Sequence, residues 1–149
     1  MQFTNDQIQR YARQISLKKI GVKGQKKLLS SKVLIVGAGG LGSPIAIYLA
    51  ALGIGNIGVV DNDKIEISNL HRQILFETQD IKKNKTLIAS KKLKKLNPNI
   101  KIITFNKKLN KSNIRNTIKN FDIIVDGSDN FRTRFLLNDF CIKSKKILI

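Results

Sequence analysis

The sequence predicts an α/β fold in which a doubly wound parallel sheet carries helices on both faces. Short apolar runs alternate with longer segments of helical spacing, which is typical of parallel strands joined by crossover helices. The first run, KVLIV, breaks into the glycine-rich turn GAGGLG at 37–42, as in Rossmann-like folds. The chain has 149 residues, 42% of them hydrophobic, which is enough for one domain with a real core. We therefore expect one nucleotide-binding domain, with a helical lead-in at 1–31 and a Rossmann-like core at 32–149.

The strands and helices of the core follow from the same alternation. Strands buried on both faces read as nearly continuous apolar runs, and such runs lie at 33–36, 57–60, 100–104, 122–126 and 146–149. The helices expected between them lie at 41–52, about 85–96, 112–119 and 131–143. We expect the strand order 3-2-1-4-5 that is common in doubly wound sheets.

The segment 85–96 has the spacing of a helix with one buried face. The positions expected inside are three and four residues apart: Thr86, Ala89, Leu93 and Leu96. The positions expected toward water are lysines: Lys91, Lys92, Lys94 and Lys95.

The charge and composition limit the partners. The formal net charge is +18, but 22 of the 28 cationic residues are lysines scattered along the whole chain. This distribution favours a solvated basic surface over a specific nucleic-acid site. No apolar run approaches the roughly 18 residues of a membrane span, and the first residues lack the features of a signal peptide. The single cysteine, Cys141, excludes an internal disulfide and a multi-thiolate zinc site within this chain, so we expect a cytoplasmic protein.

The glycine turn predicts a phosphate-binding site. Gly37, Gly39 and Gly42 fit the pattern G-x-G-x-x-G, in which backbone amides approach a phosphate at a helix N-terminus. Asp61 follows the second strand, 24 residues after Gly37, where a carboxylate can accept from ribose hydroxyls. These residues do not separate NAD from ATP, and a tight turn without any ligand is a third interpretation.

The next segment adds positive charge. SNLHRQ at 68–73 contains Arg72, and Lys85 opens the helix at 85–96. A dehydrogenase needs few cations beyond the pyrophosphate, so both side chains favour a triphosphate. A cation in the first turn of a helix is repelled by the positive end of the macrodipole, and an anion bound between the cation and the helix would offset this repulsion. In a chain this rich in lysine, Lys85 could equally be a surface residue. We expect the only histidine, His71, to face solvent or pack.

The fourth strand ends in DGSDN at 126–130, at the carboxyl edge of the sheet where open α/β folds bind ligands. Asp129 could hold Mg²⁺ against a triphosphate, because magnesium takes one or two carboxylates and leaves its other positions to water and phosphate oxygens. Alternatively, Ser128 or Asp129 caps the helix that starts near Phe131. The spacing favours neither interpretation over the other.

Seven motifs in order resemble the ThiF/MoeB/HesA family of adenylyltransferases, which are related to the ubiquitin-activating enzymes. The resemblance covers essentially the whole chain. The motifs are RYARQ at 10–14, GAGGLG at 37–42, VDND at 60–63, SNLHRQ at 68–73, Lys85, NPNIKI at 97–102 and DGSDN at 126–130.

The resemblance implies an enzyme that uses Mg-ATP to adenylate the C-terminal glycine of a small ubiquitin-like sulfur carrier, in molybdopterin or thiamine biosynthesis, and releases pyrophosphate. It implies a homodimer, because Arg13 matches an arginine that reaches the phosphates of the neighbouring protomer. Arg13, Arg72 and Lys85 match the catalytic residues, and Asp129 matches the magnesium ligand. The residues that match the ATP-binding set are Gly37, Gly39, Gly40, Asp61, Ser68, Asn69, Arg72, Lys85, Asp129 and Asn130.

Members of the family usually continue beyond this length, with a carrier-binding surface, often two C-x-x-C zinc pairs, and in some branches a catalytic cysteine. We therefore expect a C-terminally truncated domain, with zinc only in the missing part and little activity by itself. Cys141 lies inside the helix at 131–143, and we expect it to be a buried structural residue. Two alternatives stay open, namely an NAD-dependent oxidoreductase and a non-catalytic nucleotide-binding remnant.

Overall fold

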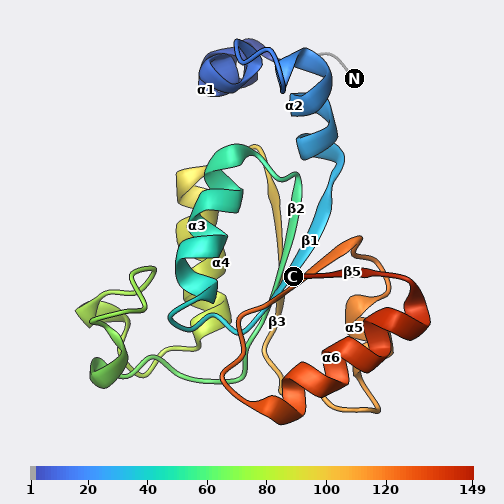
Figure 1. Ribbon diagram of the computed structural model, residues 1–149. Coiled ribbons are helices and arrows are strands. Elements are labelled where there is room, and N and C mark those ends of the chain that lie inside the picture. Colours follow the sequence, from blue (N-terminus) through green and yellow to red (C-terminus); the bar gives the residue numbers. More distant parts are fainter. Residues whose placement is uncertain (1–2) are drawn as a thin grey trace.

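The computed structural model describes residues 3–149 and has a five-stranded parallel sheet at its centre (Figure 1). The strand order is β3-β2-β1-β4-β5, as predicted. The register pairs Lys32 with Asn56 and Val36 with Val60, so the carboxyl ends of the central strands lie at one edge. The strands are β1 (Lys32–Val36), β2 (Asn56–Val60), β3 (Lys101–Phe105), β4 (Ile123–Asp126) and β5 (Ile147–Leu148).

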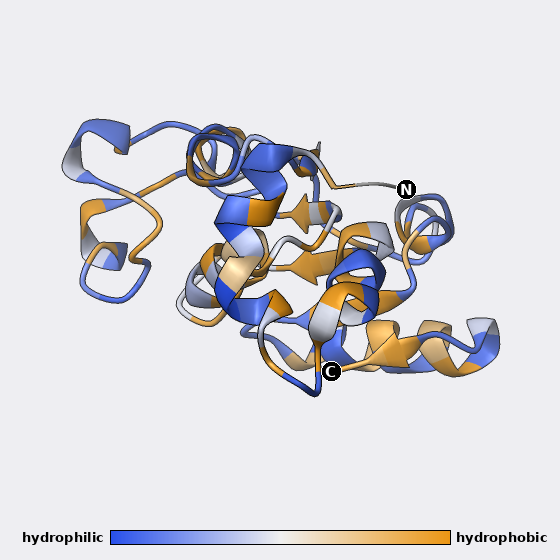
Figure 2. Ribbon diagram, turned by 90° about the horizontal axis from the view of Figure 1, so that it is seen from above, coloured by the Kyte–Doolittle hydropathy of each residue, from blue (hydrophilic) through white to orange (hydrophobic). Residues whose placement is uncertain are grey.

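Helices cover both faces of the sheet, which confirms the predicted class. Two lie on one face, α3 (Gly42–Leu52) and α4 (Lys85–Leu96), and two on the other, α5 (Ile114–Ile118) and α6 (Phe131–Ser144) (Figure 1). Val33 and Ile35 of β1 belong to the hydrophobic cluster under α3 and α4. Leu34 and Val36 belong to the cluster under α5 and α6. The alternation follows from the two-residue period of a strand, and the strands appear as hydrophobic segments in Figure 2.

The lead-in forms two helices, α1 (Asn5–Ile15) and α2 (Gly21–Ser30), at the amino edge of the sheet (Figure 1). A capping box between Thr4 and Gln7 starts α1. Tyr11 is fully buried, and its hydroxyl accepts a 2.9 Å hydrogen bond from Asn97 Nδ2. Asn97 also donates to the backbone oxygen of Ala50, at 2.7 Å. This buried polar link fixes α1 to the core.

A long crossover segment, residues 61–84, joins β2 to α4. It contains two short 3-10 helices, η1 (Ile67–Asn69) and η2 (Thr78–Asp80). Three of its side chains, Ile65, Leu75 and Phe76, are buried in the cluster under α3 and α4. Its far end is tied to α4 by ion pairs from one lysine to Glu77 and Asp80. The crossover segment is therefore held to the rest of the protein by buried side chains and by these ion pairs.

The helix α4 differs from the predicted pattern at two positions. Leu96 is 42% exposed, and Asn97, directly after the helix, is buried in its place; Ile88 is buried as well, although it is not among the predicted positions. The helix ends at Leu96, and the extended backbone of Asn97 turns that residue's side chain into the space beside Ala50. Lys92 does not point only to water, because it makes the ion pairs to the crossover segment. The other three lysines of that face are exposed, as predicted.

Smaller differences concern boundaries. The third strand begins one residue later than predicted, because its pairing with β2 starts at Lys101 and leaves the buried Ile100 outside the ladder, and α5 and β5 are shorter than predicted. Cys141 is buried in the cluster under α6, as expected, and burial raises the pKa of its thiol. Within residues 3–149, no helix has both the length and the apolar character needed to cross a membrane.

Candidate functional site

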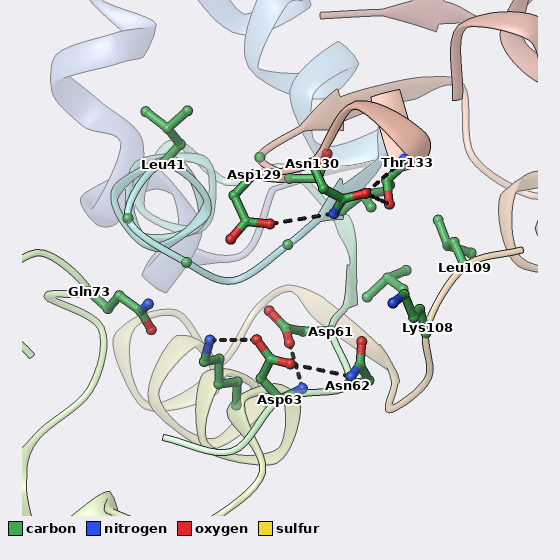
Figure 3. Close-up of a pocket in the computed structure, with 18 of the residues that line it drawn as sticks. Leu41, Asp61, Asn62, Asp63, Gln73, Lys108, Leu109, Asp129, Asn130 and Thr133 are labelled. Atoms are coloured by element: carbon green, nitrogen blue, oxygen red, sulfur yellow. Dashed lines mark hydrogen bonds and ion pairs between the residues drawn. The ribbon is translucent and has the colours of Figure 1, made fainter. Parts of the chain in front are cut away.

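One cavity of about 610 Å³ opens at the carboxyl edge of the sheet (Figure 3). The segments that line it follow β1, β2, β3 and β4, with further side chains from the crossover segment and from α4 and α6. Eight of the eleven predicted site residues line this cavity: Gly37, Gly39, Gly40, Asp61, Arg72, Lys85, Asp129 and Asn130.

The glycine turn contains two structural glycines and two that face the cavity. Gly37 has φ +90°, and a Cβ there would lie 2.7 Å from the backbone oxygen of Gly127. A Cβ on Gly42 would collide with the backbone oxygen of Gly37. The turn alone therefore accounts for these two glycines. Gly39 and Gly40 line the cavity, and a Cβ on Gly40 would lie 3.3 Å from Cδ of Arg72, whose stem crosses the turn there.

Asp61 links the glycine turn to the end of β2. Its Oδ2 accepts from the backbone N–H of Ala38, and its Oδ1 accepts from that of Asp63, both at 2.8 Å. Burial raises the pKa of Asp61, although both backbone hydrogen bonds act to lower it. Figure 3 shows its carboxylate at the cavity, beside Asn62 and Asp63. An acceptor fixed in this way suits a ligand that offers hydroxyl groups.

Lys85 is not a surface lysine. Only 4% of the residue is exposed, and its Nζ lies 3.1 Å from Asp63 Oδ2. The backbone N–H of Lys85 donates to the backbone oxygen of Asp63 as well, at 3.0 Å. The Asp63 carboxylate is therefore an anion beside the first turn of α4, and the macrodipole argument does not require a ligand. The ammonium still has further protons to donate, and it lines the cavity.

Arg72 lies over the glycine turn without a carboxylate partner in the described part of the chain. Its Nη1 is 3.4 Å from the backbone oxygen of Ser68 and 3.2 Å from Nε2 of His71. His71 is exposed, as expected, and does not line the cavity. The guanidinium is thus a cation at the cavity with most of its donors uncommitted.

The end of β4 resolves the question of the helix cap. Asn130 caps α6, because its Oδ1 accepts from the backbone N–H and the hydroxyl of Thr133, at 3.0 and 2.9 Å. The alternative interpretation, in which Ser128 or Asp129 forms the cap, is therefore wrong, and Ser128 instead donates to Asp126. Among residues 3–149, the Asp129 carboxylate accepts one long hydrogen bond, 3.4 Å from Asn130 Nδ2. Its oxygens are therefore available to a cation.

No group of three or more His, Cys, Asp or Glu residues suited to a metal ion lies within residues 3–149. A magnesium ion bound with a triphosphate needs only one or two carboxylates. Asp129 fits that requirement, because it is exposed at the cavity and is not used as a helix cap.

Three predicted residues do not line the cavity. Ser68 and Asn69, in η1, instead support the cavity-lining residues through their backbone oxygens: that of Ser68 accepts from Arg72, and that of Asn69 accepts the backbone N–H of Gln73 at 3.0 Å. Arg13 is exposed in the last turn of α1, at the opposite edge of the sheet (Figure 1). Its side chain does not belong to the cavity of its own chain.

Several lining residues were not predicted as site residues. Asp63 and Gln73 stand inside the quoted motifs VDND and SNLHRQ, so a signal existed for both. Arg134 donates to the backbone oxygen of Ser128 at 3.0 Å and had no signal of its own. Because lysines occur along the whole chain, the sequence did not single out the two lysines after β3, Lys107 and Lys108. The cavity-lining residues outside the predicted site set are Val36, Leu41, Val60, Asn62, Asp63, Gln73, Lys107, Lys108, Leu109, Gly127, Ser128, Thr133 and Arg134.

Proteins of known description are similar in sequence to this chain. The sulfur carrier protein adenylyltransferase of Thermus thermophilus is 42% identical over 149 residues, which are 100% of this chain and 55% of that relative. The adenylyltransferase and sulfurtransferase MOCS3 of Aedes aegypti is 48% identical over 145 residues, 97% of this chain and 33% of that relative. The chain therefore spans about half the length of these relatives, or less.

Solved structures share the fold. E. coli MccB with AMPCPP and MccA superposes with a TM-score of 0.83 at 33% identity, covering 93% of this chain and 43% of that one. E. coli MccB with ATP superposes with a TM-score of 0.78 at 35% identity, covering 83% and 37%. A family model described as the ThiF family matches residues 11–149. From its sheet, its glycine turn and this match over nearly all of its length, we conclude that the chain belongs to the ThiF family.

Proposed function

We propose that this protein binds Mg-ATP in the cavity and adenylates the C-terminal glycine carboxylate of a small ubiquitin-like sulfur-carrier protein. The observation that carries the proposal is that one cavity is lined by the glycine turn, by Arg72, whose stem lies against Gly40, and by the buried Lys85. The relatives add support, because those compared above are named adenylyltransferases and one is named for a sulfur carrier protein.

The nucleotide would lie along the carboxyl edge of the sheet. Asp61 would accept from the ribose hydroxyls, since its carboxylate is fixed at the end of β2 by two backbone donors. The phosphates would lie against the turn at Gly39 and Gly40, where the stem of Arg72 passes Gly40 and the amide of Gln73 lies near Gly39. Arg72 and Lys85 would neutralise the triphosphate from the side of the crossover segment.

Magnesium belongs to the proposal as the partner of Asp129. The carboxylate is exposed at the cavity, and Asn130 beside it is held by its capping hydrogen bonds to Thr133. A bound magnesium ion would neutralise charge on the phosphates that leave as pyrophosphate.

The reaction requires alignment more than acid-base chemistry. The carrier carboxylate is already ionised and attacks the α-phosphorus, an acyl-adenylate anhydride forms, and the bond to the bridging oxygen breaks as pyrophosphate leaves. Donors fixed before the reaction stabilise the charge that develops on the phosphoryl oxygens. Lys85 is fixed by its ion pair with Asp63, so its ammonium is held in place before a ligand arrives.

The proposal includes a homodimer in which Arg13 acts in the neighbouring protomer's site. Arg13 lies at the opposite edge of the sheet from its own cavity, so it can reach only the phosphates bound by a second chain. In a complete homologue that carries these residues, a mixture of Arg13→Ala and Lys85→Ala protomers should then recover some adenylation activity through heterodimers with one intact site. A mixture that stays inactive despite subunit exchange would count against this role.

A cytoplasmic location, where ATP and reduced thiols such as Cys141 are found, is the last part of the proposal.

Calorimetry can test the choice of nucleotide. We expect the protein to bind Mg-ATP and to bind NAD only weakly. Arg72→Ala or Lys85→Ala should weaken ATP binding by about 1–3 kcal/mol, the range for a lost hydrogen bond to a charged group. Lys94→Ala, an exposed lysine of the same helix as Lys85, is the matched control. Tight binding of NAD, with an affinity that neither substitution changes, would indicate an oxidoreductase instead. Carrier-dependent exchange of pyrophosphate into ATP is to be measured in a complete homologue that carries these residues, and ATP binding without exchange there would indicate a nucleotide-binding protein that does not adenylate.

A further inference from the structure

Gln73 carries a polar atom that the fold does not satisfy. The residue is 4% exposed, and in residues 3–149 its Oε1 is the one buried side-chain nitrogen or oxygen without a hydrogen-bond partner. Leaving such an atom without a partner is costly, and native proteins mostly avoid it. A methionine or leucine would fill the same space without that cost, so folding alone gives no reason for an amide here.

The main chain holds the amide at the cavity. The backbone N–H of Gln73 donates to the oxygen of Asn69 at 3.0 Å, and the backbone N–H of Phe76 donates to the oxygen of Gln73 at the same distance. Leu75 and Phe76 are buried in the hydrophobic core immediately afterwards. These contacts fix the main chain of this stretch, so the backbone of Gln73 stays at the cavity.

The amide nitrogen lies toward the glycine turn. Nε2 of Gln73 is 3.8 Å from the position that a Cβ of Gly39 would occupy, and both residues line the cavity. In Figure 3, Gln73 enters the cavity from the crossover segment, on the side away from Lys108 and Leu109. The donor of the amide thus faces the end of the cavity where the turn presents its backbone.

We propose that Gln73 is a ligand-binding residue whose amide donates hydrogen bonds to anionic oxygens at the phosphate end of the cavity. The role rests on the proposed function, which brings two anions together there, the α-phosphate and the attacking carboxylate. Two hydrogens on one nitrogen can bridge two oxygens. A neutral donor aligns two anions without the tight pairing that a further cation would impose.

Gln73→Met separates a binding role from a structural one. Removing the unsatisfied oxygen should leave the melting temperature of this protein unchanged or raise it. In a complete homologue that carries these residues, the same substitution should lower the rate of carrier-dependent pyrophosphate exchange by at least tenfold. Gln79→Met, at an exposed glutamine of the same crossover segment, is the control and should change neither. Gln73→Glu keeps the shape but replaces the donor by a carboxylate, and it should lose more activity than Gln73→Met because it repels both anions.

The two sources of the anionic oxygen give different results. If the phosphate is the partner, Gln73→Met weakens Mg-ATP binding measured without carrier, and if the carboxylate is the partner, it raises KM for the carrier and leaves ATP affinity unchanged. The role is overturned if Gln73→Met loses stability and activity in parallel, or keeps both. A wild-type protein that binds no ATP would overturn the proposed function itself, and this role with it.

Discussion

The ion pairs of Lys92 are expected to hold the crossover segment against α4. Its Nζ lies 2.7 Å from Glu77 Oε1 and 2.9 Å from Asp80 Oδ2, and the Asp80 side chain is only 7% exposed. Removing one member of a fully buried pair costs about 3–5 kcal/mol, because the other charge is left buried. Here Lys83 remains 3.7 Å from Asp80, and the Glu77 side chain is 57% exposed. We therefore expect Lys92→Met to destabilise the fold by about 1–3 kcal/mol, nearer the cost of an unsatisfied buried group.

The effect should depend on pH. Burial by itself would raise the pKa of Asp80, but the hydrogen bond and charge of Lys92 dominate and lower it below the ordinary 3.8. Burial likewise opposes the charge of Lys92, yet its two partners raise its pKa above 10.5. A lowered carboxyl pKa gives stability that is present above 3.8 and lost as the pH falls through the folded value. A raised lysine pKa gives stability that is present below 10.5 and lost as the pH rises through its folded value. The cost of Lys92→Met should therefore be largest between these limits and should shrink at both extremes.

Urea and thermal unfolding at several pH values measure this cost, since each kcal/mol lowers the melting temperature of a domain of this size by about 2–4 °C. Lys94→Met, exposed on the same helix, is the control and should cost little. In an Asp80→Asn background the buried charge is gone, so Lys92→Met should cost much less there. The reasoning is refuted if Lys92 and Lys94 substitutions cost the same at neutral pH, or if the cost in acid equals the neutral one.

Three further predictions concern the turn, the ribose acceptor and the lead-in. Gly42→Ala should destabilise the fold by at least about 1–3 kcal/mol and abolish ATP binding, because its Cβ meets the Gly37 oxygen; unfolding and calorimetry check both. Burial raises the pKa of Asp61, so ATP affinity should fall on acidification at a pH above 3.8 in the wild type, with no such step in Asp61→Asn when the two titrations are compared. Gly53→Ala should cost about 1–2 kcal/mol for its φ of +85° and about 1–3 kcal/mol more for the clash with the Tyr11 ring, whose atoms lie 2.6–2.7 Å from the new Cβ. Replacing Tyr11 by Leu should remove only the second part in denaturant unfolding.

The sheet could be predicted because its central strands, β1, β2 and β4, are largely buried and are therefore nearly uninterrupted apolar runs. The position of the cavity followed too, since parallel strands bring the residues after β1, β2 and β4 to one edge. The cap of α6 could not be predicted, because Ser128, Asp129 and Asn130 are all capping residue types in adjacent positions. Only the backbone course after β4 decides that Asn130 faces the N–H of Thr133.

Pairings across long sequence separations were also beyond the sequence. Lys85 and Asp63 are 22 residues apart, and nothing local distinguishes this lysine from its many neighbours. The buried Asn97 replaced Leu96 at the end of the predicted stripe because a partner 86 residues away, Tyr11, offers it a hydrogen bond. Helical periodicity describes one helix and not what packs against it, so it missed both.

The residues of the cavity are held in two different ways. The glycine turn and Asp61 follow directly from strand ends, so the register of the sheet fixes them, and substitutions there should change stability and ligand affinity together. Arg72 and Gln73 belong to the crossover segment, whose position depends on buried anchors such as Leu75 and Phe76. Because these anchors are separate from the ligand-facing groups, changes at Arg72 or Gln73 should alter affinity with little loss of stability. The crossover segment is thus the part of the site where specificity can change without rebuilding the fold.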